Sequence, residues 1–142
     1  MLDALLDHYD RMWPRIEELV TARPSAGLVL EGSGVWPANV VRLTTPYTKA
    51  VWLTADEDVL ASRMRRASRY DELPDGSRRL VDKFLARSLG YQTRMLTLVD
   101  HLALNHLDVT TPRSPEHVAD ELLELTRSHD GWPSSDDTSR GL

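Results

Sequence analysis

Short apolar runs alternate with longer helical patterns along this chain, and that alternation restricts the folds open to it. The runs are residues 28–30 and 50–53, with a weaker third at 107–109. Short strands separated by helices are typical of βα units, whose parallel strands are covered by helices on both faces. We therefore expect an α/β fold with a short parallel sheet flanked by helices.

The expected helices follow from apolar residues at three- and four-residue spacing. Segment 2–20 is interrupted by Pro14, where we expect either a kink or a new helix start. The longest helix is expected over 77–104, where Gly90 would weaken or divide it. Further helices are expected at 37–43 and 54–68, and from Ser114 to about Leu125. The expected buried stripe of the longest helix is Leu80, Phe84, Tyr91, Met95, Leu98, Val99 and Leu102.

Length and composition indicate one domain. A chain of 142 residues is long enough for one continuous core and too short for two. Its net charge of −5, with 41% hydrophobic residues, is typical of a folded globular protein and gives no sign of a nucleic-acid binder. We expect a single domain over 1–128, and a polar, disordered tail over 129–142. Trp36 and Trp52 are expected in the core or in a pocket wall.

Several classes of protein are disfavoured by what the sequence lacks. There is no cysteine, which excludes disulfides and thiolate zinc sites. The five histidines form no H-x-x-x-H pair, so we expect no metal site. The N-terminus lacks the basic start of a signal peptide, and no apolar run approaches the roughly 20 residues of a membrane helix. We expect a cytoplasmic protein that does not bind membranes.

One candidate site follows the first apolar run. Glu31 would stand at the carboxyl edge of a parallel sheet, where open α/β sheets bind ligands. A carboxylate there can hold Mg²⁺ or accept a proton, although Glu31 would equally serve as a turn residue. Gly32, Ser33 and Gly34 would offer backbone N–H groups to an anion, or simply form a flexible turn.

Arginines are concentrated in the middle of the chain. Nine of the 17 basic residues lie between positions 63 and 94. Guanidinium groups suit phosphate because they make paired hydrogen bonds and stay charged. On a helix Arg63 and Arg66 can project on the same side, with Arg65 and Arg69 in a neighbouring row. We expect an anion-binding segment, and the alternative is a solvated helix face whose arginines pair with the local acids Asp71, Glu72, Asp75 and Asp82.

Arg87 stands apart, between positions expected to be buried. An unpaired charge there would be costly, so we expect it to have a specific partner. Glu31, another acid or a bound phosphate would each satisfy it.

The order of motifs resembles small P-loop kinases of the nucleotide and small-molecule kinase type. The motifs are V-L-E-G-S, V-W-L-T-A, an arginine-bearing helix, a lid-like loop and K-F-L-A-R-S-x-x-Y, and the resemblance covers about residues 5–126. It implies that Glu31 assists Mg²⁺ or the acceptor hydroxyl. It also implies that Arg66 and Arg87 clamp the transferred phosphoryl group, with Arg63 and Arg69 behind them.

The chain departs from these kinases in its missing P-loop. The motif G-x-x-x-x-G-K-[ST], which holds the nucleotide phosphates, is absent, as are the family's first strand and first helix. We expect this chain alone to be no competent kinase, with Mg²⁺ and ATP bound only if missing sequence or a partner supplies a P-loop. It would be a fragment, a degenerate relative or half of a split phosphotransferase. The alternative is a non-catalytic binding or assembly module for an anionic small molecule or nucleotide.

The missing strand also has a consequence for the sheet. In such kinases it lies between the strands that correspond to 28–30 and 50–53. Unpaired buried backbone groups are too costly to leave open. We therefore expect direct pairing of these two segments, or completion by a second copy or a partner strand, with self-association.

Overall fold

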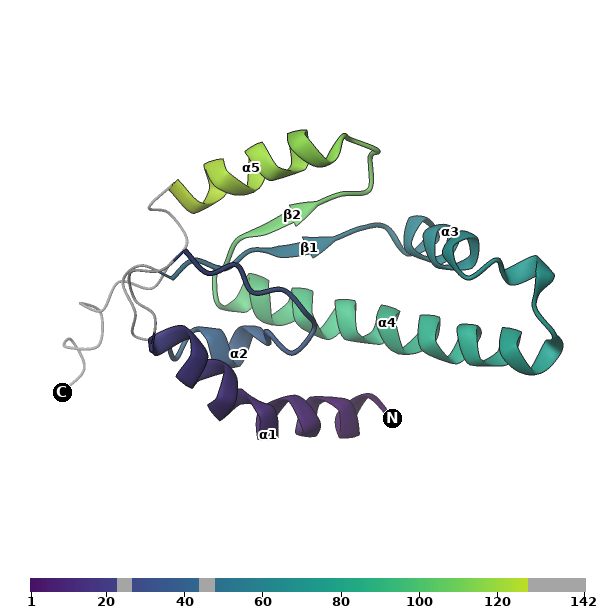
Figure 1. Cartoon of the computed structure of the whole chain (residues 1–142), viewed down its shortest axis with the longest axis horizontal. Helices are drawn as coiled ribbons and strands as arrows, with labels where there is room; N and C mark the ends of the chain where they lie inside the picture. Colours follow the sequence, from purple (N-terminus) through teal and green to yellow (C-terminus); the bar gives the residue numbers. More distant parts are fainter. Residues whose placement is uncertain (23–26, 44–47, 128–142) are drawn as a thin grey trace.

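The computed structural model describes residues 1–22, 27–43 and 48–127. It is a mixed α/β structure, mostly helical, with a short two-stranded parallel sheet (Figure 1). The elements, in chain order, are α1 (Leu2–Thr21), α2 (Pro37–Val40), β1 (Trp52–Thr54), α3 (Glu57–Ala67), the 3₁₀ helix η1 (Tyr70–Glu72), α4 (Asp75–His101), β2 (His106–Asp108) and α5 (Pro115–Arg127).

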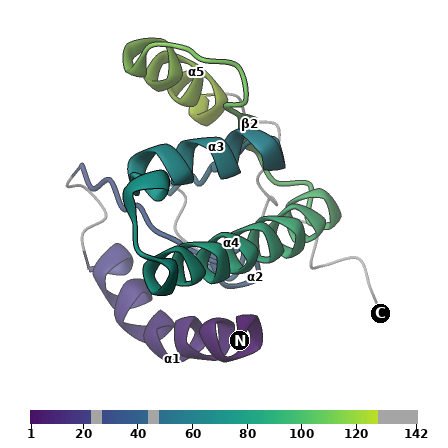
Figure 2. The same cartoon turned by 90° about the vertical axis from the view of Figure 1, so that its right-hand side faces the viewer.

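The sheet pairs β1 with β2 in parallel, with Leu53 opposite Leu107. Parallel strands need a crossover connection, and α3, η1 and α4 provide it. α4 and α5 lie on opposite sides of the sheet (Figures 1 and 2), while α1 and α2 pack against α4. The expected α/β class with helices around a short parallel sheet is confirmed. The expected strands at 50–53 and 107–109 are found displaced by one or two residues.

Three tryptophans from separate parts of the chain form the centre of the core. Trp13, Trp36 and Trp52 are each less than a tenth exposed, which confirms the expectation for the latter two. The indole N–H of Trp52 donates to the Val35 carbonyl oxygen at 3.0 Å, so its polar edge is satisfied. The remaining buried members of the cluster are Val40, Leu43, Met95, Val99 and Leu104.

The expected strand at 28–30 is absent. No strand is assigned there, and the side chains are exposed, Val29 by 94%. The expected direct pairing of this segment with 50–53 is therefore wrong, because β1 pairs with β2 instead. An apolar run becomes a strand only when a neighbouring backbone lies within hydrogen-bonding distance, and the run at 28–30 has no such neighbour among the described residues.

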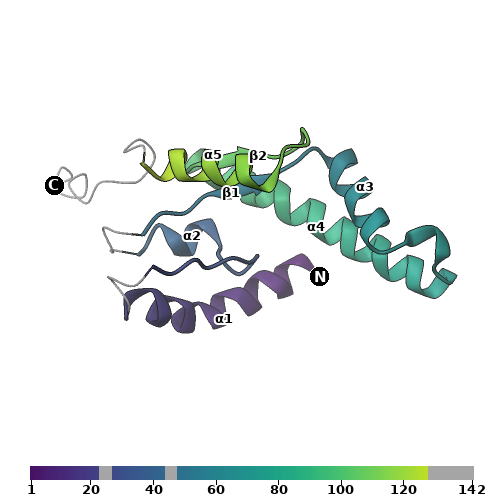
Figure 3. The same cartoon turned by 45° about the horizontal axis from the view of Figure 1, so that its top comes forward.

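The helices differ from expectation in their limits more than in their number. Pro14 lies inside one helix, and Gly90 does not divide α4. Phe84 and Leu80 are exposed, by 49% and 67%, so their expected burial is wrong, while Met95 and Val99 are buried as expected. The first half of α4 projects beyond the sheet together with α3, where no further layer covers it (Figure 3).

The remaining limits are small corrections. The helix expected over 37–43 ends at Val40. The helix expected over 54–68 begins at Glu57, because Thr54 belongs to β1. The expected tail at 129–142 lies outside the described residues. No helix in the described ranges is both long and apolar enough to cross a membrane.

Candidate arginine site and neighbouring cavities

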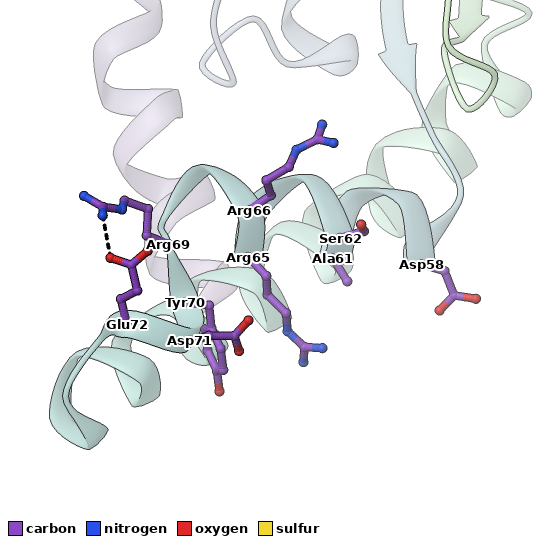
Figure 4. Close-up of a pocket in the computed structure, with 9 residues that line it drawn as sticks. All are labelled: Asp58, Ala61, Ser62, Arg65, Arg66, Arg69, Tyr70, Asp71 and Glu72. Carbon is purple, nitrogen blue, oxygen red and sulfur yellow. Dashed lines mark ion pairs between the residues drawn. The ribbon is translucent and has the colours of Figure 1, made fainter.

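A cavity of about 590 Å³ lies against the outer face of α3 and η1 (Figure 4). Two of the predicted phosphate ligands, Arg66 and Arg69, line it, and so does Arg65. Its other lining residues are Asp58, Ala61, Ser62, Tyr70, Asp71 and Glu72. The arginine segment thus surrounds a hollow in the surface, but it shares that hollow with three carboxylates.

The local sequence explains how α3 presents these side chains. Glu57 and Asp58 lie in its first turn and Arg65 and Arg66 in its last, each favoured by the helix dipole. The helix ends where Arg69 adopts a left-handed backbone conformation, with φ 52° and ψ 48°. That conformation terminates helices because it turns the chain out of the helical path. The turn leads directly into η1 and places Glu72 beside Arg69.

The three cavity arginines differ in their contacts. Arg69 forms an ion pair with Glu72, with Nη2 and Oε2 2.5 Å apart, and both side chains are exposed. The guanidinium of Arg65 lies 5.3 Å from the centre of the Tyr70 ring. The Arg66 side chain points away from that of Arg65 (Figure 4), and its guanidinium has no hydrogen bond, ion pair or ring contact with any described residue. Of the three cavity arginines, Arg66 is thus the one whose guanidinium contacts no other side chain among the described residues.

The wall of the cavity at η1 is tied to α4. The Tyr70 hydroxyl donates to Asp82 Oδ2 at 2.9 Å, and this hydrogen bond raises the Tyr70 pKa above its ordinary value. Arg78 donates from Nε to the Tyr70 carbonyl oxygen at 3.2 Å and from Nη2 to that of Asp71 at 2.8 Å. η1 is thus held in place by side chains of the first two turns of α4. This role of Arg78 was not predicted from the sequence.

Arg63 lies outside this cavity. Its Nη2 donates to the Val109 carbonyl oxygen at 2.7 Å, just beyond β2. The contact joins α3 to the end of the sheet and satisfies part of a half-buried guanidinium. Arg63 therefore has a structural partner, and its part in phosphate binding stays a prediction.

Arg87 lies in α4 and lines neither this cavity nor the second one described below. Its guanidinium lies 4.8 Å from the centre of the Phe84 ring, and no carboxylate in the described parts of the chain pairs with it. Neither Glu31 nor another acid is the expected partner of Arg87 among the described residues, and a bound phosphate stays a prediction. Its predicted role as a phosphate clamp remains a prediction.

Glu31 and the glycine turn form a separate region between α1 and α4. Glu31 is exposed and has no partner among the described residues. Gly32 has φ 138°, which strongly favours glycine, and its carbonyl oxygen accepts from the Val35 N–H at 3.1 Å. The predicted anion loop of Gly32, Ser33 and Gly34 is therefore a turn, and its binding role stays a prediction.

Two tyrosines hold that turn from opposite helices. The hydroxyls of Tyr9 and Ser33 lie 2.5 Å apart, and the Tyr91 hydroxyl donates to the Ser33 carbonyl oxygen at 2.8 Å. Burial raises the Tyr91 pKa to about 12. The turn is fixed in place by contacts that the sequence pattern does not reveal.

A second cavity, of about 520 Å³, lies at the carboxyl ends of β1 and β2 and was not predicted. It is lined by Thr54, Ala55, Asp56, Glu57, Gln92, Thr93, Leu96, Thr97, Asp100, His106 and Asp108. The Asp108 carboxylate accepts from the Thr110 N–H at 2.7 Å, and hydrogen bonding with Thr110 lowers the Asp108 pKa. The rule that ligands bind at this edge of an α/β sheet would have pointed to Asp56, two residues after the end of β1.

Neither cavity has the ligand set of a metal centre. Across the described ranges, no three histidine or carboxylate side chains converge closely enough to hold a metal ion.

Comparison with known proteins found no matching family model, no matching curated protein and no matching solved structure. The resemblance to P-loop kinases therefore remains a hypothesis based on the motifs alone.

Proposed function

We propose that this chain binds a phosphate-bearing small molecule over the arginine face of α3, with Arg66 as the primary ligand. The observation that carries the proposal is the unpartnered Arg66 guanidinium at the rim of a cavity of about 590 Å³. A guanidinium offers a planar fork of donors that matches two phosphate oxygens. No described side chain competes for that fork.

Arg69 would join Arg66 by leaving its ion pair with Glu72 and pairing with the phosphate instead. Its ion pair with Glu72 is exposed on both sides, and exposed pairs contribute at most about 1 kcal/mol. A doubly charged phosphate attracts a guanidinium more strongly than one carboxylate does, so the exchange is favourable. The three acids lining the cavity, Asp58, Asp71 and Glu72, repel an anion, so the ligand has to contact the arginines directly.

We propose that the chain with this binding site is a partial or degenerate phosphotransferase of the P-loop kinase type. In that case the arginine face serves as the phosphate-binding lid, and Mg²⁺ and ATP are held by a P-loop from other sequence or a partner. The alternative is a non-catalytic binding or assembly module that uses the same face. The absence of a G-x-x-x-x-G-K-[ST] motif favours the alternative for this chain by itself.

Calorimetric titration with inorganic pyrophosphate at constant ionic strength tests the binding proposal. Arg66→Ala should weaken binding at least several-fold, and Arg66→Lys should restore only part of it, because lysine keeps the charge without the fork. Arg15→Ala provides the matched control, since Arg15 is exposed on α1 and lines neither cavity. Equal affinities for Arg66→Ala and Arg15→Ala would refute a specific site.

A parallel titration with ATP and Mg²⁺ separates the two forms of the proposal. We expect binding no tighter than that of pyrophosphate, because no P-loop amides or lysine are present to hold the additional phosphate. A dissociation constant in the low micromolar range for the magnesium–nucleotide complex would contradict this expectation. It would show that the chain holds a nucleotide without a P-loop.

A further inference from the structure

One edge of β1 has no strand beside it in the described part of the chain. The Trp52 N–H donates to the Asn105 carbonyl oxygen at 3.2 Å, and the Thr54 carbonyl oxygen accepts from the Val109 N–H at 2.7 Å. Backbone groups of successive strand residues point to opposite edges, so those of Leu53 point away from β2. Among the described residues no strand lies at that edge, and the Leu53 side chain is 50% exposed.

The same chain exposes a second apolar segment that is suited to a strand. Leu28, Val29 and Leu30 are exposed by 40%, 94% and 39%, with no strand assigned. Figure 3 shows the connection between α1 and α2, to which they belong, running apart from β1. Contiguous exposed apolar surface is a feature of sites where proteins contact other chains.

We propose that two copies of this chain associate by strand addition, with residues 28–30 of each copy lying along the Leu53 edge of β1 in the other. One chain carries both halves of the contact, and neither half is paired with another described segment. In a dimer with a two-fold axis this contact would form twice, once with residues 28–30 of each copy. Each copy would gain a third strand, and sheets of three strands are considerably more stable than pairs.

The residue types of segments 28–30 and 52–54 favour a second copy of the chain as the partner. Neither 28–30 nor 52–54 contains a charged residue or a proline, two of the features that block strand addition at an edge. Backbone hydrogen bonds would supply the pairing, and the aliphatic side chains would supply apolar area. None of the residues of the α3 cavity is involved, so the contact is independent of anion binding.

Engineered cysteines test the contact directly, because the native chain has none. Copies carrying Val29→Cys are mixed with copies carrying Leu53→Cys under mild oxidation. We expect a covalent heterodimer to form at least several-fold faster than with Leu80→Cys, a matched control that is 67% exposed on α4. Equal rates would overturn the proposal. So would preferential Leu53-to-Leu53 cross-linking, or an intramolecular disulfide in the dilute double variant.

Light scattering over a concentration series provides a second readout that does not depend on oxidation. The native chain should form dimers, and Val29→Lys should remain monomeric. Val29 is 94% exposed, so the lysine costs the isolated copy little, and an unchanged melting temperature in dilute solution would show that it still folds. Leu80→Lys should dimerise like the native chain. A native chain that stays monomeric at every concentration, or equal behaviour of the two lysine variants, would overturn the proposal.

Discussion

Gln92 on α4 binds both backbone groups of Ala55, the residue that follows β1. Its Nε2 donates to the Ala55 carbonyl oxygen at 2.8 Å, and its Oε1 accepts from the Ala55 N–H at 3.1 Å. Ala55 is 5% exposed, so few other partners are available to these groups. The carboxyl end of β1 and one wall of the second cavity are therefore held by one amide side chain.

Replacing Gln92 should destabilise the fold. Gln92→Leu leaves the Ala55 N–H and C=O groups unsatisfied and should cost about 2 kcal/mol or more of unfolding free energy. Urea denaturation measures this change in the free energy of unfolding. Gln92→Glu should recover part of the loss in acid, where a protonated carboxyl can both donate and accept. Native stability of Gln92→Leu would contradict the assigned role.

Replacing Ala103 by glycine and replacing Ala86 by glycine should change the stability of the fold in opposite directions. Ala103 follows the end of α4 with φ 51°, and the next residue, Leu104, donates to the Val99 carbonyl oxygen at 2.8 Å in a helix-terminating turn. Ala103→Gly should therefore stabilise by about 0.5 to 1 kcal/mol. Ala86→Gly, inside the same helix, should destabilise by about 1 kcal/mol. Denaturation midpoints with the same sign for both changes would contradict this prediction.

Gly90 and Gly32 form a matched pair of glycine-to-alanine changes. A Cβ on Gly90 would lie 3.5 Å from Leu2 Cδ2, an ordinary contact, so Gly90→Ala should stabilise α4 by about 0.5 to 1 kcal/mol. Gly32→Ala has open space but a φ of 138°, and should destabilise by about 1 kcal/mol or more. Thermal unfolding of both variants checks the prediction, and a loss of stability on Gly90→Ala would refute the packing inferred there.

Asp108 should contribute to acid unfolding. Hydrogen bonding with Thr110 holds its pKa below the ordinary value, so the unfolded chain takes up this proton first as the pH falls. The stabilisation is therefore present above the ordinary aspartate pKa of about 3.9, and is lost as the pH falls through the lower folded value. Asp108→Asn keeps an oxygen acceptor for the Thr110 N–H but removes the titration. Its unfolding free energy should fall less steeply in acid than that of the native chain.

The arginine site was predictable in part. Arg66 lies in the last turn of α3 and Arg69 in the turn that directly follows it, so their closeness in sequence brings both to one cavity. Arg63 is on the same helix, yet it contacts Val109, 46 positions away. Spacing along a helix cannot indicate which carbonyl oxygen a distant segment will bring to that side chain.

The sequence by itself determined the local features of this protein: which segments form helices, to within a few residues at their ends, and the α/β class with its short parallel sheet. Only the tertiary structure decided that residues 28–30 remain unpaired, that Phe84 is exposed, and that Tyr91 holds a turn 58 positions away. Apolar spacing records the intrinsic preference of a segment. Pairing and burial depend on which other segments reach it, and that is a property of the whole packed chain.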